Sequence, residues 1–241
     1  MRRFLGTLTA VVFLMVAVFT PAALADNFAI SLVMDVSGSI SSTEFDLQKD
    51  GYANAITNLI PTDGTVALSV IEFGLNNNVS IGWTVIDSAA AKTTFVTAIN
   101  GLSRAGISTG ATAIGDAITA ADGYFASLAG SWDYFIIDVT TDGANNYGSN
   151  PVTAAQTAVD SGNTDVVNAL GIGTGTAPTF AYGTNYDGSP AFALLTPDFT
   201  TFNDALEDKF EKEIPVQTPE PTTMLLLGFG LLGLACFRRK E

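Results

Sequence analysis

The chain of 241 residues contains no histidine, and its single cysteine is Cys236. Without histidine there is no Ser-His-Asp arrangement, no histidine-ligated zinc site and no side chain whose ordinary pKa lies near neutral pH. One cysteine, set in an apolar run near the end of the chain, forms no intrachain disulfide and supplies no thiol catalysis to a folded domain. These absences exclude the commonest hydrolytic and thiol-based active sites.

Basic residues are scarce, with ten Lys and Arg against 24 Asp and Glu and a net charge of −14. Residues 26–218 hold five of the basic residues and 22 of the acidic ones, which gives that segment a net charge of −17. Binding to a phosphate backbone needs clustered Lys and Arg, so we expect no nucleic-acid partner. The acidity instead suits solubility outside the cell and the binding of cations.

The first 25 residues have the pattern of a secretory signal peptide. Arg2 and Arg3 precede an apolar run from Phe4 to Phe19, and Ala23-Leu24-Ala25 forms a cleavage motif of small residues. A permanent N-terminal anchor is the alternative, but the Ala-Leu-Ala motif favours cleavage. We therefore assign residues 1–25 to a signal peptide that signal peptidase removes, with the mature chain starting at Asp26.

The end of the chain combines three features in a fixed order. Pro219-Glu220-Pro221 is followed by a 14-residue apolar run, Met224 to Phe237, and then by the basic residues 238–240. This run is short for a membrane-spanning helix of about 20 residues, and a plain C-terminal anchor is the alternative. Together the three features resemble the PEP-CTERM sorting signal, which we assign to residues 215–241.

That resemblance has consequences for processing and location. It implies that in a Gram-negative bacterium an exosortase recognises the tail and removes it. The protein would then pass to the outer envelope, the cell surface or the extracellular matrix, and would contact the membrane only through its two ends before processing.

Between these ends, apolar strand-like runs alternate with segments of helical periodicity. Strands are expected at 28–34, 65–73, 79–86 (at the sheet edge), 132–139, 166–172 and 191–195, and helices at 43–60, 88–102, 113–128, 154–161 and 199–214. This alternation predicts an α/β fold in which residues 26–214 form a single domain: a doubly wound, mostly parallel sheet with helices on both faces. Ser42 or Thr43 is expected to cap the first helix. The closing helix is expected to be amphipathic, with its charges on one side.

Three loops at the expected strand ends carry oxygen-bearing side chains. Asp35, Ser37 and Ser39 follow the first strand, Thr112 opens a helix within "STGATAIGDAI", and Asp142 ends a strand within "VTTDGANN". In an open α/β sheet, ligands bind beyond the carboxyl ends of the strands, so these loops can meet there. Carboxylates and hydroxyls suit a divalent cation, Mg²⁺ first and otherwise Mn²⁺ or Ca²⁺. An ordinary strand-to-helix turn with an N-cap is the alternative interpretation.

This pattern of DxSxS, then Thr, then Asp resembles the metal-ion-dependent adhesion site of von Willebrand factor type A domains, over nearly all of residues 26–214. The resemblance implies that the hydroxyls of Ser37, Ser39 and Thr112 contact the metal or its waters, and that Asp35 and Asp142 act mostly through water. It further implies an open metal position for an acidic group of a partner.

Three segments are similar to an uncharacterised bacterial branch of that superfamily, a domain of unknown function. They read "LQKDGYANAI", "GATAIGDAI" and "FIIDVTTDGANN". Family members often carry two glycines before the threonine, whereas this chain has Ala111 at the second position. Alanine is small enough that we expect the turn to survive. The branch implies no activity.

Further candidates have weaker signals. Asp116 could orient a ligand of the site or interact with the helix N-terminus, and Asn145 and Asn146 are expected to shape the loop after Asp142. Glu72 ends a strand and could face the same cleft. The glycine-rich segment 171–175 lacks the Lys-Ser/Thr ending of a phosphate loop and is expected to be a flexible strand exit.

Three functions fit these features. The first is an exported binding or adhesion module that captures an acidic group of a protein or exopolysaccharide through a divalent ion. The second is a structural matrix protein with a vestigial metal site. The third is a metal-assisted hydrolase, which needs a base or nucleophile near the ion. Because the chain has no histidine and no usable cysteine, we expect that it is not an enzyme.

Overall fold

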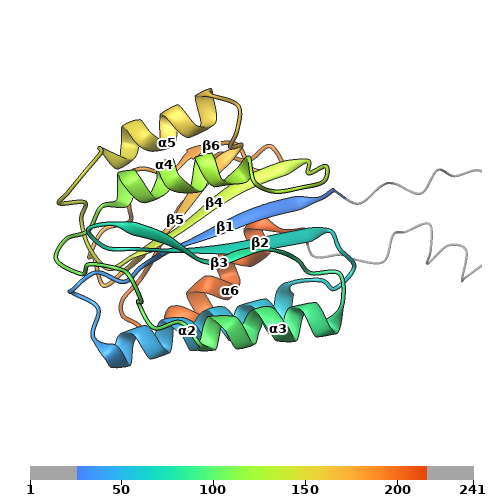
Figure 1. The fold of residues 1–241 in the computed structure, drawn as a ribbon. Helices are drawn as coiled ribbons and strands as arrows, with labels where there is room; N and C mark the ends of the chain where they lie inside the picture. Colours follow the sequence, from blue (N-terminus) through green and yellow to red (C-terminus); the bar gives the residue numbers. More distant parts are fainter. Residues whose placement is uncertain (1–25, 216–241) are drawn as a thin grey trace, which may run out of the picture. The chain divides into compact units, whose positions relative to one another are not determined.

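The computed structural model describes residues 26–215 (Figure 1). The predicted signal peptide and, apart from Pro215, the predicted sorting tail lie outside the described residues. Among the helices of residues 26–215, none combines the length and apolar character that a membrane crossing requires.

A seven-stranded sheet forms the centre of the domain, and six of its strands follow the order β3-β2-β1-β4-β5-β6. Neighbouring strands among β1, β2, β4 and β5 pair in parallel, β7 pairs in parallel with β5, and β3 and β6 are antiparallel. The strands span Phe28–Asp35 (β1), Val66–Phe73 (β2), Asn77–Val85 (β3), Tyr134–Thr141 (β4), Val166–Ile172 (β5), Tyr182–Gly183 (β6) and Ala193–Thr196 (β7). The expected mostly parallel sheet is therefore confirmed, including the edge position of β3.

Helices cover both faces of this sheet, as a doubly wound fold requires (Figure 1). One face carries α2 (Ser42–Leu59), α3 (Ala89–Asn100) and α6 (Phe202–Glu213), and the other carries α4 (Ile114–Phe125) and α5 (Pro151–Asp160). Because side chains alternate along a strand, Ile30 and Leu32 of β1 join the first core, whereas Ala29 and Val33 join the second.

Helix starts differ from the expected ones by a few residues, for identifiable reasons. Ser41, rather than Ser42 or Thr43, caps α2: its hydroxyl accepts the Glu44 N–H, and the Glu44 carboxylate accepts the Ser41 N–H. This reciprocal pair is a capping box. Helix α5 begins at Pro151, three residues earlier than expected, because proline fits the first helical position and the Asn150 side chain caps the helix.

The expected distribution of charge on the closing helix is wrong. Lys209 and Glu213 of α6 are fully buried, and the Lys209 Nζ lies 2.7 Å from Oδ1 of Asp138 on β4 and 2.6 Å from Oε1 of Glu213. Burial and then the neighbouring Asp138 charge raise the pKa of Glu213 to about 8. The Lys209 ammonium thus contacts both Asp138 and Glu213 in the core and fixes α6 against the central strands.

We expect Lys209→Met to destabilise the domain by about 3–5 kcal/mol, because the substitution leaves the buried Asp138 carboxylate without its counter-charge. Urea unfolding of the two proteins measures this loss. Lys212→Met is the matched control, since Lys212 is exposed on the same helix and its loss should change stability by less than about 0.5 kcal/mol. If both substitutions lowered the free energy of unfolding by the same amount, the buried cluster would contribute no more stability than an exposed lysine.

The raised pKa of Glu213 also predicts a pH dependence. The folded state holds a proton on Glu213 up to about pH 8, whereas the unfolded state releases it near the ordinary value of 4.5. The stability from this group is therefore complete below pH 4.5 and is lost as the pH rises to about 8. Relative to Glu213→Gln, which stays neutral, the wild-type free energy of unfolding should fall across this window. A constant difference between the two proteins from pH 4.5 to 8 would contradict the assignment.

Candidate metal centre

Four of the five predicted site residues lie at the carboxyl ends of β1 and β4, which are neighbours in the sheet. Asp35 is the last residue of β1, with Ser37 and Ser39 in the loop that leads to α2, and Asp142 directly follows β4. This edge of the sheet is on the left in Figure 1. The structure therefore places these four residues at one edge of the sheet.

A continuous set of hydrogen bonds joins the four residues. The Ser37 and Ser39 hydroxyl oxygens lie 3.2 Å apart, and the Ser39 hydroxyl donates to Oδ1 of Asp142 at 2.7 Å, across 103 residues of sequence. The Asp35 carboxylate accepts the Ser37 N–H at 2.9 Å through Oδ1. Asp35 and Ser37 are buried, Asp142 is half-buried and Ser39 is exposed, so the set runs from the surface to the sheet.

Thr112 reaches the site through a different connection. Its backbone N–H donates to Oδ1 of Asn146 at 2.8 Å, and its carbonyl accepts the Asn146 N–H at 3.0 Å. Asn146 belongs to the loop that follows Asp142, so this pair ties the Thr112 loop to the Asp142 loop. Within residues 26–215, no hydrogen bond joins the Thr112 hydroxyl to the other four side chains.

The loop with the two serines is fixed by contacts from outside it. The Gly38 N–H donates to the Thr109 carbonyl at 2.8 Å, and a Cβ at position 38 would lie only 2.8 Å from that oxygen. Only glycine permits this approach of two backbones. Arg104 donates to the Ile40 and Ser41 carbonyls, both at 2.9 Å. The loop is therefore held by a backbone contact to Thr109 and by the Arg104 side chain.

Arg104 and Ala111 differ in backbone conformation. Arg104 is the one non-glycine residue with positive φ in the described part of the chain, at 58°. Ala111, which stands where family members often have glycine, lies outside the left-handed region. Alanine at this position therefore carries no strain from a positive φ.

The two carboxylates of the site have perturbed electrostatics. Burial raises the pKa of Asp35 to about 6, against hydrogen bonds from Thr141 and Ser37 that lower it, and burial also raises the pKa of Asp142. The ion pairs within residues 26–215 involve Asp46, Asp138 and Glu213, and neither Asp35 nor Asp142. These carboxylates therefore have hydroxyl and N–H partners but no basic side chain in contact.

The donor set fits a hard divalent cation. All five side chains offer oxygen, and Mg²⁺, Mn²⁺ and Ca²⁺ prefer oxygen ligands. No cluster of three carboxylate, imidazole or thiol groups suited to a metal occurs in residues 26–215. A metal at this edge would therefore depend on the serine and threonine hydroxyls in addition to the two aspartates.

Thr141 also contributes to the site, although the sequence pattern did not indicate it. The Thr141 hydroxyl donates to Oδ2 of Asp35 at 2.6 Å, so the residue before Asp142 holds the carboxylate at the end of β1. Side chains alternate between the two faces of a strand, so residue 141 shares a face with residues 137 and 139 of β4. Those two residues pack in the same core as Ala29 and Val33 of β1. This alternation could have identified Thr141 as a neighbour of β1.

The other candidate residues have structural roles. Asp116 accepts the Ser149 N–H at 2.9 Å and so connects α4 to the loop before α5. Asn146 holds Thr112, as described above, and Asn145 Oδ1 accepts the Gly115 N–H at 3.4 Å near the start of α4.

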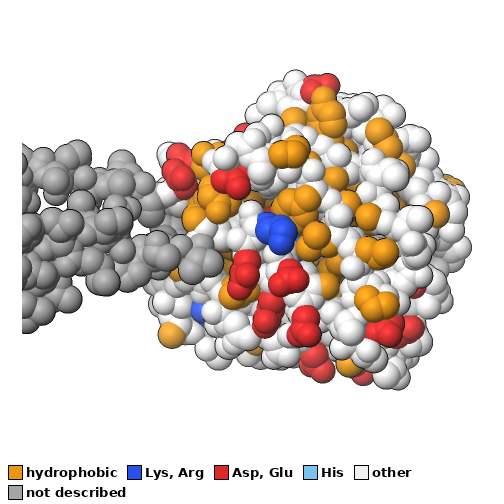
Figure 2. Space-filling view, turned by 180° about the vertical axis from the view of Figure 1, so that it is seen from behind, with side chains coloured by type: hydrophobic (Ala, Val, Ile, Leu, Met, Phe, Trp, Pro, Cys, Tyr) orange, Lys and Arg blue, Asp and Glu red, His pale blue; other side chains and the backbone are white. Residues whose placement is uncertain are grey.

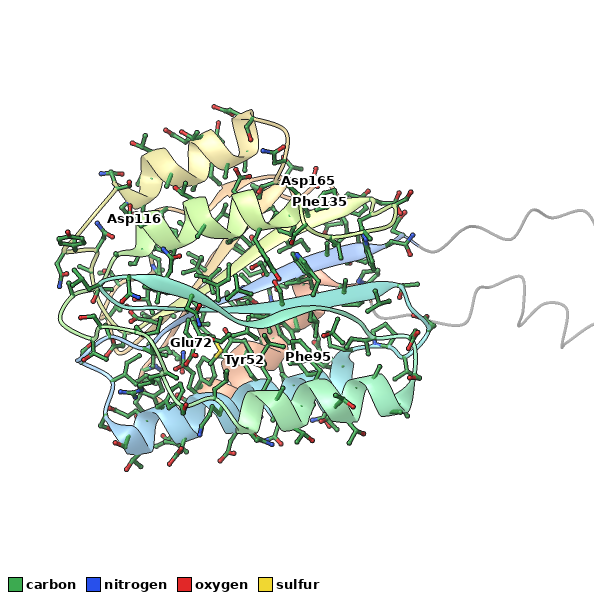
Figure 3. All side chains as sticks on the ribbon, in the orientation of Figure 1. Tyr52, Glu72, Phe95, Asp116, Phe135 and Asp165 are labelled. Atoms are coloured by element: carbon green, nitrogen blue, oxygen red, sulfur yellow. The ribbon has the colours of Figure 1, made fainter. Side chains whose placement is uncertain are left out.

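Glu72 does not face the site. Figure 3 shows it on the side of the sheet that faces α2 and α3, together with Tyr52 and Phe95. There its carboxylate accepts a hydrogen bond from the Ser80 hydroxyl. The suggestion from sequence that Glu72 shares the cleft is therefore wrong, because adjacent positions of a strand point to opposite faces: in register with Glu72 is Met34, not Asp35.

Comparison with known proteins identifies both parts of the chain. Residues 25–218 match the family described as "Protein of unknown function (DUF1194)", and residues 217–240 match the PEP-CTERM protein-sorting motif. The motif indicates an exported protein that an exosortase processes. No curated protein matches the chain.

Solved structures with the same fold come from diverse organisms. Proximal thread matrix protein 1 from the mussel byssus is 23% identical with a TM-score of 0.57, over 76% of this chain and 45% of that one. A von Willebrand factor type A protein from Catenulispora acidiphila is 18% identical with a TM-score of 0.58, over 79% and 43%. BatB from Bacteroides thetaiotaomicron is 18% identical with a TM-score of 0.55, over 78% and 98%.

The present chain thus spans less than half the length of the mussel protein's solved chain, and at these identities the likeness concerns the fold. Taken with the match over residues 25–218, it completes the assignment. The chain belongs to the DUF1194 family, and its domain has the von Willebrand factor type A fold with a C-terminal PEP-CTERM motif.

Proposed function

We propose that Asp35, Ser37, Ser39, Thr112 and Asp142 bind a divalent cation, Mg²⁺ before Mn²⁺ or Ca²⁺. The domain is then an exported adhesion or binding module that captures an acidic group of its partner through this ion. The observation that carries the proposal is the 2.7 Å hydrogen bond from Ser39 to Asp142, which brings two distant loops together at the ligand-binding edge of the sheet.

The chemistry of the site supports this assignment over an ordinary capping turn. Helix α2 is capped by Ser41, so the hydroxyls of Ser37 and Ser39 are free of that role. The ion would supply positive charge beside the buried carboxylate of Asp35 and the half-buried carboxylate of Asp142. One solved form of the mussel byssus protein has a zinc-occupied MIDAS motif, which supports a metal site in this fold.

A binding role fits the site better than catalysis. The chain has no histidine, and Asp35 and Asp142 already accept hydrogen bonds from Thr141 and Ser39. A general base beside the ion would need a side chain that is free to accept a proton from the substrate.

The surface chemistry and the sorting motif agree with life outside the cell. On the face shown in Figure 2, acidic side chains outnumber basic ones, as the charge of −17 for residues 26–218 leads us to expect. The PEP-CTERM motif supports delivery to the outer envelope, cell surface or matrix, where a protein or exopolysaccharide partner would be met.

We expect millimolar Mg²⁺ to stabilise the domain against heat, because an ion that binds only the folded state adds about 2.7 kcal/mol at a hundred times its dissociation constant. For a domain of this size that corresponds to a rise of about 2–4 °C in Tm per kcal/mol. Ser37→Ala combined with Ser39→Ala should lose the response yet still fold in chelator, because neither hydroxyl belongs to the apolar core.

The matched control is Ser42→Ala with Ser131→Ala, which changes two exposed serines outside the site. This variant should respond to Mg²⁺ as the wild type does. A wild-type Tm that is the same in chelator and in millimolar Mg²⁺, Mn²⁺ or Ca²⁺ would reject the metal site and leave a structural matrix protein with a vestigial one.

Processing gives a separate prediction. The mature protein from its native host should begin at Asp26 and end near Pro219-Glu220-Pro221, because signal peptidase and exosortase act at the two ends. Intact-mass measurement of protein from the cell surface or matrix tests both boundaries. Retention of residues 224–241 on the mature protein would instead indicate a simple membrane anchor.

A further inference from the structure

A cavity of about 510 Å³ lies directly beside the candidate metal centre, and Thr141 and Asp142 form part of its wall. Its other walls come from Ile114 at the start of α4, Pro151 at the start of α5 and the loop 173–180. Small-molecule sites have volumes of about 300–1,000 Å³. The cavity therefore has room for a small molecule next to the ion.

The outer wall of this cavity is an ordered loop. The Gly173 N–H donates to the Thr196 carbonyl at 2.9 Å, and the Thr174 hydroxyl donates to the Thr176 carbonyl at 2.7 Å. A Cβ at Gly171 would lie 2.7 Å from the Thr174 Oγ1 and 2.9 Å from the Pro178 Cδ. The loop thus packs directly on the end of β5.

The lining combines neutral polar groups with apolar surfaces. Thr176, Thr179 and Asn145 offer hydroxyl and amide groups, whereas Pro151 and Pro178 offer hydrocarbon. Among the lining residues, only Asp142 is charged. Sugars present hydroxyls that both donate and accept hydrogen bonds, together with C–H faces that pack on apolar side chains. An aspartate or glutamate side chain of a protein partner would leave most of this volume empty.

We propose that this cavity binds a uronic acid residue of an acidic polysaccharide, with the sugar ring in the cavity and its carboxylate directed to the ion. This inference rests on the proposed metal site. Asp142 repels an anion unless a cation lies between them, so the sugar binds only while the ion is present. The cavity then provides selectivity for a sugar, and the ion provides selectivity for its carboxylate.

Isothermal titration calorimetry with trigalacturonic acid tests the inference on the secreted domain. Binding is expected in Mg²⁺ and is lost in chelator, and the carboxyl-reduced neutral trisaccharide binds at least tenfold more weakly. Ala177→Trp places a large side chain at an exposed position of the cavity wall and abolishes sugar binding. Thr176→Val with Thr179→Val removes two hydroxyls without changing side-chain volume and weakens binding about tenfold.

The control is Ala126→Trp, which adds the same bulk at an exposed position at the other end of α4. This variant binds the trisaccharide as the wild type does. Both tryptophan variants keep the Mg²⁺-dependent rise in Tm, since neither changes an oxygen donor. Equal sugar binding by Ala177→Trp and wild type, or equal binding of the neutral and acidic trisaccharides, would overturn the inference.

Two results separate this inference from the proposed function. If Mg²⁺ raises the Tm but trigalacturonic acid does not bind, the metal site stands and the sugar site is rejected. If Mg²⁺ has no effect on the Tm, the metal site fails first, and the sugar inference falls with it.

Discussion

The burial of β1 is the constraint on which the rest of the site depends. This strand lies between β2 and β4 with helices on both faces, and all of its residues from Phe28 to Asp35 are buried. The last of them is a carboxylate, which is costly to hold out of water unless it is hydrogen-bonded or paired. Thr141 and the Ser37 N–H meet that requirement. These two hydrogen bonds fix the end of β4, and the serine loop that follows β1, relative to the end of β1. The position of Asp142 beside Ser39 therefore follows from the need to accommodate Asp35.

Two of the buried carboxylate sites in residues 26–215 differ in how their charge is met. Asp138 lies on β4 in register with Leu32, and Lys209 provides its counter-charge from within the chain. This first site has its counter-charge, which holds α6 on the sheet. Asp35, on the other face, has only hydroxyl and N–H partners, and it is linked through the serines to Asp142 near the surface. Lys209 supplies the positive charge beside Asp138, whereas no basic side chain of the described residues contacts Asp35. An external cation could therefore supply the positive charge at Asp35.

Strong periodic patterns predicted the fold well, and weak local patterns did not. Runs such as residues 28–34 and 166–172 are apolar throughout, so the buried parallel strands and their order along the chain followed directly. The two-residue strand β6 has no periodicity to detect. At the site, Asp35, Ser37, Ser39 and Asp142 could be brought together from the rule that carboxyl ends of parallel strands share an edge. The Asp138–Lys209–Glu213 cluster could not, because the partners lie on β4 and α6 and sequence spacing alone does not reveal which charges a tertiary contact will bury.

Different segments of the chain form the candidate metal centre and the adjacent cavity. The proposed donors come from the loops after β1 and β4 and from the start of α4, where backbone contacts such as Gly38 to Thr109 leave little freedom. The cavity wall comes mainly from the loop 173–180, which contacts the end of β5 through Gly171 and the end of β7 through Gly173. Residues 176, 177 and 179 of this loop are exposed, so substitutions there leave the core packing and the oxygen donors intact. The fold therefore allows the shape of the cavity to change without altering the proposed donors, because the constraint imposed by Asp35 does not extend to the loop that lines the cavity.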